Sequence, residues 1–288
     1  MSSNDPDHVS MRTINRRFAA PVIESAVASL NLTTGARVLD FGPYGGVAFP
    51  FLAHAVGTTG SVLAVDNHPP FVALAADYAE QTGVADRVTV QLGDISEVLA
   101  DAATTPEKAF DAIWAYDAIL AMYCEEPADV VRQIAQALRP GGIAAIFYNN
   151  FYNATVLPGH SRLERGLSTA SEIDLGLPAN GPRHKGRHLA WLQAAGLDNV
   201  SLTMFPQVCF PVDSDPTLRP YLEQGVWPFL RNLATNHGAT AGLSTAEVDE
   251  IHRLTTPGHP DYILDEPGYY YALPTTLATG RRPTQAPQ

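Results

Sequence analysis

The sequence predicts an α/β fold, in which a doubly wound and mostly parallel sheet is covered by helices on both faces. Short β-branched runs alternate with helical patterns along the first 150 residues, which is typical of βαβ units. A glycine-rich turn follows the first predicted strand. The chain has 288 residues, of which 45% are hydrophobic, so it is long enough to bury the core of one large domain.

The predicted sheet has seven strands. Five apolar runs are predicted strands: Arg37–Phe41, Ser61–Val65, Val88–Leu92, Ala109–Ala115 and Ile143–Tyr148. Apolar residues at helical spacing predict the intervening helices: Phe18–Leu30, Val47–Val56, Pro70–Thr82 and Ala128–Leu138, the last ended by Arg139-Pro140-Gly141-Gly142. Later in the chain we expect a helix at Leu189–Gly196 and two strands at Val200–Phe205 and Tyr269–Thr279.

Two long segments interrupt this alternation. Phe151–Arg187 is rich in Gly, Pro, Asn and His, and Pro211–Tyr262 is a predicted helical insertion. Both are too long to be simple connections. Long excursions of this kind are usually lids or substrate-binding loops, so we expect them to contribute to the functional site.

The composition excludes several classes of protein. The net charge is −12, from 30 acidic and 18 basic residues, and no basic stripe is present to neutralise the phosphates of a nucleic acid. The two cysteines, Cys124 and Cys209, lie outside any CxxC spacing, which argues against a disulfide framework or a metal site and favours a reducing compartment. The polar N-terminus and the lack of apolar runs near the ~20 residues that span a bilayer favour a cytoplasmic protein without a membrane segment.

The strongest local motif is Val38-Leu39-Asp40-Phe41-Gly42-Pro43-Tyr44-Gly45-Gly46. An apolar strand runs into a glycine cluster and then into a helix, which lets the backbone approach a nucleotide-like ligand closely. A purely structural tight turn is the alternative interpretation. Asp66 ends the second strand about 20 residues after Gly46, the spacing at which a carboxylate binds the ribose hydroxyls in dinucleotide-binding folds. The alternative for Asp66 is a plain strand-end residue.

Further motifs occur in order along the first half of the chain: Gly93-Asp94 after the third strand, Phe110-Asp111-Ala112-Ile113 in the fourth, and Leu138-Arg139-Pro140-Gly141-Gly142 before the fifth. Together with the glycine turn and Asp66, they resemble the class I S-adenosylmethionine-dependent methyltransferases. The resemblance covers Ala36–Asn149. It implies a Rossmann-like sheet with an antiparallel last strand, and S-adenosyl-L-methionine as the cofactor.

The resemblance also assigns residues to the cofactor. It implies that Asp40, Gly42 and Gly46 bind it. The middle glycine of the family's turn is replaced by Tyr44 in this chain, so Gly45 is expected to act as a local substitute. Tyr44 is expected either to cover the methionine end of the cofactor or to be a surface ring on the turn.

Asp94 and Ile95 would border the adenine, with Asp94 accepting from its exocyclic amine.

The predicted organisation of the chain is a single domain. It is divided into a cap helix at 1–30, a cofactor-binding core at 31–150, a lid or substrate insertion at 151–187, more core at 188–210, a helical substrate insertion at 211–262, and the last strand and tail at 263–288.

In doubly wound sheets, ligands bind beyond the carboxyl ends of the central strands. The fourth and fifth strands end near Tyr116 and Asn149, which we predict to position an acceptor. His160 is a candidate general base, on the condition that its loop folds back over the pocket. No metal is expected.

The predicted function is methyl transfer to the O, N or C of a small-molecule metabolite, as in secondary metabolism, with no nucleic-acid or membrane partner and with a homodimer left open. One alternative keeps the cofactor but catalyses a non-methylating cyclisation or rearrangement. A nucleotide-dependent oxidoreductase is disfavoured, because Tyr44 and Val47 occupy the second and third glycine positions of G-x-G-x-x-G. A non-enzymatic binding module is the third alternative.

Overall fold

The computed structural model describes residues 6–284, without the side chains of residues 6–13 and of Tyr44. It contains one seven-stranded sheet in the order β3-β2-β1-β4-β5-β7-β6. The strands are β1 (Arg37–Phe41), β2 (Ser61–Asp66), β3 (Val88–Leu92), β4 (Phe110–Tyr116), β5 (Leu138–Tyr148), β6 (Asp198–Cys209) and β7 (Tyr271–Arg281). The first five run parallel, and β7 is antiparallel to both of its neighbours. The predicted fold class is therefore confirmed.

Helices cover both faces of the sheet. Those that pack on the sheet are α1 (Pro6–Ser29), α2 (Phe49–Val56), α3 (Pro69–Gln81), α4 (Ile95–Thr104), α5 (Pro127–Ala137) and α7 (His188–Ala194). A second group packs in a separate core: α6 (Ser161–Asp174), α8 (Leu218–Tyr221), α9 (Trp227–His237) and α10 (Thr245–Leu254). Successive residues of a strand point to opposite faces, so Val38 packs in the core under α1 to α3, whereas Leu39 packs in the core under α4, α5 and α7. No helix among residues 6–284 is both long and apolar enough to cross a membrane.

The structure differs from the sequence prediction at a few elements. Helix α4 was not predicted, although Ile95, Leu99 and Ala102 recur at helical spacing and pack against the sheet. Helix α1 begins at Pro6 rather than at Phe18. Strand β6 spans Asp198–Cys209 rather than Val200–Phe205, because it stays paired with β7 from Ser201 out to Cys209. This pairing satisfies backbone groups that sequence periodicity does not reveal.

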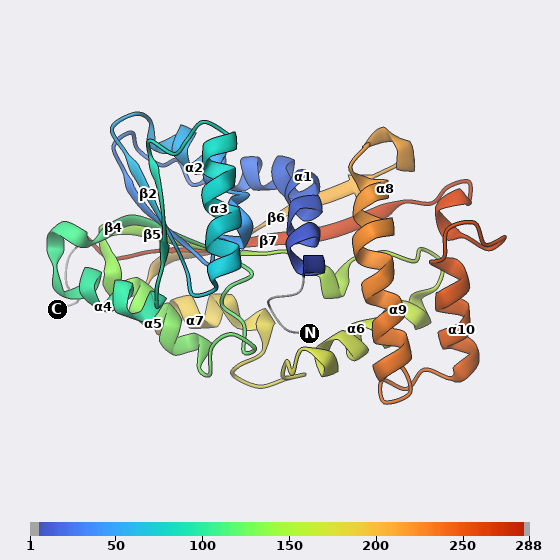
Figure 1. The fold of residues 1–288 in the computed structure, drawn as a ribbon. Coiled ribbons are helices and arrows are strands. Elements are labelled where there is room, and N and C mark those ends of the chain that lie inside the picture. Colours follow the sequence, from blue (N-terminus) through green and yellow to red (C-terminus); the bar gives the residue numbers. More distant parts are fainter. Residues whose placement is uncertain (1–5, 285–288) are drawn as a thin grey trace.

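Strands β6 and β7 form a long ribbon that leaves the sheet and enters a second helical region (Figure 1). Strand β5 pairs with β7 only as far as Thr276, while β6 stays paired with β7 out to Tyr271. The far end of the ribbon packs in a separate hydrophobic core with α6 and α8 to α10, which we call the cap helices. Helix α1 lies between the sheet and the cap helices (Figure 1).

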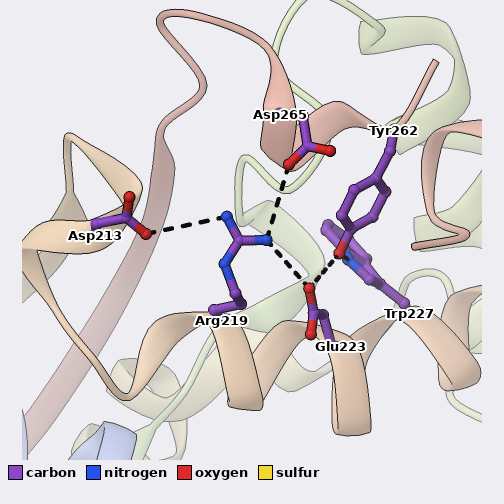
Figure 2. A network of polar contacts seen from close by, with 6 residues as sticks. All are labelled: Asp213, Arg219, Glu223, Trp227, Tyr262 and Asp265. Atoms are coloured by element: carbon purple, nitrogen blue, oxygen red, sulfur yellow. Dashed lines mark hydrogen bonds and ion pairs between the residues drawn. The ribbon is translucent and has the colours of Figure 1, made fainter. Parts of the chain in front are cut away.

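A network of polar contacts holds the start of helix α8 in place (Figure 2). Arg219 of α8 pairs with Glu223 at 3.2 Å and lies within 4.0 Å of Asp213 and Asp265. Glu223 also accepts a hydrogen bond from the hydroxyl of buried Tyr262 at 2.9 Å. These contacts join α8 to Asp213, shortly before the helix, and to the distant segment of Tyr262 and Asp265, and so they hold the helix turn that faces α1.

Candidate functional site

The glycine turn lies at the carboxyl end of β1. Gly42, Gly45 and Gly46 have φ values of +65°, +74° and +89°, a region that side chains other than glycine rarely adopt. A Cβ atom on Gly42 would lie 2.9 Å from the Cβ of Ala118, just after β4. Tyr44 opens the short turn Tyr44–Gly46, but its side chain lies outside the described structure. The turn therefore requires glycine, and it touches the end of β4.

Asp40 is a buried acid at the end of β1. Its side chain is only 1% exposed, and neither carboxylate oxygen has a hydrogen-bond partner among the described residues. Burial raises the pKa of Asp40 to about 8, and repulsion from Asp66 on the neighbouring strand adds to this effect. An uncompensated carboxyl at this depth is costly, and a cationic ligand group would stabilise it.

Asp66 ends β2, beside β1. One of its carboxylate oxygens, Oδ1, accepts a hydrogen bond from the backbone N–H of His68 at 2.9 Å and lies 3.5 Å from the His68 ring Nδ1. These contacts hold the side chain at the carboxyl edge of the sheet, where it is 13% exposed. The other oxygen, Oδ2, makes neither of these two contacts, so the geometry is compatible with the ribose contact predicted for this residue.

Asp94 and Ile95 follow β3 at the same edge. The Asp94 side chain caps α4, because its Oδ1 accepts from the backbone N–H of Ser96 at 2.8 Å. Asp94 is exposed, and Ile95 is half-buried. The structure thus gives Asp94 a helix-capping contact in addition to the adenine contact predicted for it.

Arg16 of α1 is a residue that the sequence analysis did not assign to the site. Its guanidinium lies 3.8 Å from the centre of the Tyr78 ring and donates a hydrogen bond to the Gly45 carbonyl oxygen at 2.5 Å. It is 7% exposed, its burial lowers its pKa, and no carboxylate in the described chain lies within ion-pair distance. Its position seven residues before buried Ile23, on the same face of α1, was the available sequence signal.

A small cavity lies beneath α1, at the carboxyl ends of β4 and β5. Its volume of about 10 Å³ is enough for roughly one water molecule. Eleven residues line it: Asn15, Phe18, Ala19, Val22, Tyr116, Phe147, Asn149, Gln207, Tyr221, Leu273 and Thr275. They come from α1, the ends of β4 and β5, the turn at α8, and both strands of the ribbon.

Tyr116 and Asn149 meet in this cavity, as expected for neighbouring strand ends. The Asn149 side-chain amide donates to the Tyr116 hydroxyl at 3.4 Å, and the Asn149 backbone N–H donates to Asp117 at 2.9 Å. Tyr116 packs edge-on against Phe147 with ring centres 5.0 Å apart. Sequence reasoning did not find Gln207, Thr275 or the α1 residues, which reach the cavity from distant segments.

His160 is placed elsewhere. It precedes α6, and its Nδ1 lies 3.0 Å from a carboxylate oxygen of Glu250 in α10. It is not among the residues that line the cavity. The structure therefore does not bring His160 together with Tyr116 and Asn149. The helix that follows it, α6, packs in the hydrophobic core of the cap helices instead of folding back over the sheet.

Comparison with known proteins agrees with this geometry. The methyltransferase GfsG of Streptomyces halstedii is 29% identical over 180 residues, which make up 62% of this chain and 59% of GfsG. A family profile described as a methyltransferase domain matches residues 38–142, from β1 to the turn within β5. These findings support a class I S-adenosylmethionine-dependent methyltransferase. The cofactor of this family is S-adenosylmethionine.

Two further comparisons extend beyond the matched core of this methyltransferase. The 27-O-demethylrifamycin SV methyltransferase of Amycolatopsis mediterranei is 29% identical over 172 residues, 60% of this chain and 57% of that protein. The structure of a methyltransferase candidate from Bacillus halodurans superposes with a TM-score of 0.52 at 18% identity, covering 91% of this chain and 99% of that one. The chain thus spans less than two thirds of these two curated relatives, while it shares the fold of the solved structure.

Proposed function

We propose that this methyltransferase transfers a methyl group from S-adenosylmethionine to an O, N or C atom of a small-molecule metabolite held beneath α1. The observation that carries the proposal is the adjacency of the two sites. The end of β4 contributes Tyr116 to the cavity and, two residues later, Ala118 to the contact with Gly42 of the glycine turn. A donor on the turn and an acceptor in the cavity would therefore be neighbours.

The residues around the glycine turn fit the cofactor. S-Adenosylmethionine ends in an amino acid that carries both an ammonium and a carboxylate. Asp40 offers a buried carboxyl without a partner, and Arg16 offers a buried guanidinium without a described carboxylate. We propose that these two side chains hold the two charges of the zwitterion, and that Asp66 holds the ribose hydroxyls.

When bound, S-adenosylmethionine supplies a methyl group already activated by its sulfonium. The protein's contribution is to align the acceptor, and positioning of this kind is worth ~7–11 kcal/mol. Tyr116 and Asn149 would orient the acceptor through hydrogen bonds, and the walls formed by Phe18 and Phe147 would exclude water. None of the eleven described residues that line the cavity is Asp, Glu, Lys, Arg or His, so this arrangement favours catalysis by positioning over general-base catalysis.

The relatives support a specialised substrate. One of them is described as acting on a demethylrifamycin, so it methylates an oxygen of a complex natural product. The cap helices of this chain and its closed cavity are compatible with a similarly specialised acceptor in secondary metabolism. We place this reaction in the cytoplasm, on the basis of the sequence composition alone.

The experiment supplies S-adenosylmethionine with a deuterated methyl group to the purified protein together with candidate metabolites. We expect a labelled product and one S-adenosylhomocysteine for each product molecule, both measured by mass spectrometry. An unlabelled product without S-adenosylhomocysteine would instead identify a cyclisation or rearrangement. Binding of NADH in place of S-adenosylhomocysteine, measured by calorimetric titration, would contradict the proposal altogether.

A further inference from the structure

Three buried polar oxygens converge on the cavity beneath α1 and accept from no donor in the described part of the chain. They are the side-chain oxygens of Asn149, Gln207 and Thr275. Thr275 is only 1% exposed. Most buried polar side chains in proteins have a hydrogen-bond partner, so three such atoms around one small cavity indicate a site built for a ligand group.

The hydrogen bonds already formed determine what this site offers. The Gln207 amide nitrogen donates to the Phe18 carbonyl oxygen at 2.7 Å, which leaves its oxygen as an acceptor. The Asn149 amide nitrogen donates to the Tyr116 hydroxyl, which likewise leaves its oxygen as an acceptor. The Thr275 hydroxyl can donate or accept. The ligand group must therefore donate: an NH2 group can donate to both amide oxygens, whereas a hydroxyl donates to one of them and accepts from Thr275.

Long-range strand pairing places these residues together. Thr275 lies one residue beyond Thr276, the last partner of β5, and Asn149 follows Tyr148, the residue that pairs with Thr276. Gln207 lies on β6, two residues beyond the partner of Thr275. The three oxygens thus surround the point where the ribbon leaves the sheet.

The side chains that line the cavity carry no formal charge at neutral pH. None of the eleven residues that line the cavity is Asp, Glu, Lys, Arg or His. Phe18 stacks on Tyr221 with ring centres 4.2 Å apart and closes one side of the cavity. A carboxylate, phosphate or ammonium group entering this space would lose its hydration without gaining an oppositely charged partner.

We propose that Asn149, Gln207 and Thr275 form a specificity subsite for an uncharged acceptor, which presents a hydroxyl or N–H group from an otherwise apolar body. This inference rests on the proposed function, since it concerns the acceptor of the same reaction. The cavity of about 10 Å³ accommodates one such group, while the body of the acceptor requires α1 to move aside. The subsite thus selects the acceptor by its neutral donor group.

Thermal unfolding of the cofactor-free protein gives the first test. An unpartnered buried hydroxyl does not stabilise the fold, so we expect Thr275→Val to keep or raise the Tm of the protein. Thr275→Ser keeps the hydroxyl and loses only a methyl group. Once the effect of that methyl group is subtracted, its Tm should lie within about 1 °C of the parent's. The control is Thr279→Val on the same strand, because the Thr279 hydroxyl is hydrogen-bonded to Ser201 at 2.9 Å. A larger fall in Tm for Thr275→Val than for Thr279→Val would show a structural role and overturn the proposal.

Ligand binding gives the second test, with five probes that share one benzene ring: benzyl alcohol, benzamide, benzyl methyl ether, benzoate and benzylammonium. Each is titrated by ligand-observed NMR into the protein saturated with S-adenosylhomocysteine. We expect the alcohol and the amide to bind at least tenfold more tightly than the two ions and the ether. In Gln207→Leu, which removes one of the two acceptor oxygens, the preference for the alcohol over the ether should shrink to about threefold or less.

The outcomes separate this inference from the proposed function. Equal binding of alcohol and ether to the parent, tighter binding of either ion, or no binding of the alcohol would overturn the neutral-donor subsite. An unchanged preference in Gln207→Leu would also overturn it and would leave the cavity as a site for structural water. Failure of S-adenosylhomocysteine to bind the parent would instead contradict the proposed function itself.

Discussion

The glycine turn and the cavity beneath α1 lie side by side at one edge of the sheet, yet they differ in electrical character. Around the turn, Asp40 and Arg16 are buried with no partner of opposite charge among the described residues. The residues that line the cavity carry neutral amides, hydroxyls and aromatic rings. A buried charge is tolerated only where something compensates it, so the first region suits a charged ligand and the second suits an uncharged one.

The largest effect that tests this difference between the two regions is expected at the proposed ribose contact of Asp66. Asp66→Ala should weaken S-adenosylhomocysteine binding by about 100-fold or more, because two charge-assisted hydrogen bonds of ~1.5–3 kcal/mol each would be lost. Calorimetric titration measures the effect. The control is Asp86→Ala, which removes an exposed carboxylate and should leave the affinity within twofold. Near-parental affinity in Asp66→Ala would place the ribose elsewhere.

In the uncharged cavity beneath α1, substitutions are expected to change turnover. With an identified acceptor, Tyr116→Phe and Asn149→Ala should each lower kcat at least tenfold, which corresponds to ~1.4 kcal/mol of lost positioning. Cofactor affinity should stay within about threefold, because both side chains face the cavity rather than the glycine turn. Steady-state kinetics and calorimetry together decide the matter. A change in cofactor affinity with unaltered kcat would mean that Tyr116 and Asn149 contribute to cofactor binding and not to positioning of the acceptor.

The charged side also predicts a pH-dependent stability. The pKa of Asp40 is raised to about 8 in the folded protein, whereas an unfolded Asp titrates near 3.9. The neutral Asp40 carboxyl therefore stabilises the folded protein fully below about pH 4, and this contribution to the free energy of unfolding is lost as the pH rises toward 8. Asp40→Asn avoids this loss, so its Tm should exceed that of the parent by a margin that grows at least ~3 °C between pH 5 and pH 8.

Thermal unfolding at several pH values measures this margin, with Asp86→Asn as the control for an acid-to-amide change at an exposed position. The Asp40→Asn variant should also bind S-adenosylhomocysteine more weakly, since it lacks the negative charge proposed to hold the ammonium. A margin independent of pH would show that Asp40 is ionised in the folded protein.

The smallest effect is expected at His160. Its ring contacts Glu250 in the cap helices and is absent from the cavity. His160→Gln should therefore change kcat by less than about twofold, with an unaltered shape of the pH–rate profile. Loss of one limb from that profile would show that His160 reaches the acceptor as a general base after all.

The two regions also differ in how far the sequence predicts them. The glycine turn, Asp66 and Asp94 each lie directly after a short strand, so local patterns were sufficient to place them at one edge of a parallel sheet. The antiparallel last strand followed from the family resemblance. These features depend on contacts within about 30 residues, the range over which a βαβ unit is specified.

The cavity is assembled from segments that are more than 30 residues apart, and the sequence predicted only Tyr116 and Asn149. Gln207 reaches it because β6 continues past its expected end, and Thr275 because the register of β7 turns that residue toward α1. Neither length nor register follows from local periodicity. Two adjacent threonines, Thr275 and Thr276, within an apolar strand were the available hint, since both are buried and buried hydroxyls require a partner or a purpose.

Helix α1 joins the two regions through consecutive residues. Asn15 lines the cavity, and Arg16 is hydrogen-bonded to the glycine turn. A displacement of this helix that admits an acceptor therefore also disturbs a contact of the turn. Coupling between binding sites is thermodynamically reciprocal, so the factor by which the cofactor alters acceptor affinity must equal the factor by which the acceptor alters cofactor affinity. An inhibitor that holds α1 away from the cavity would accordingly loosen a cofactor with which it shares no contact.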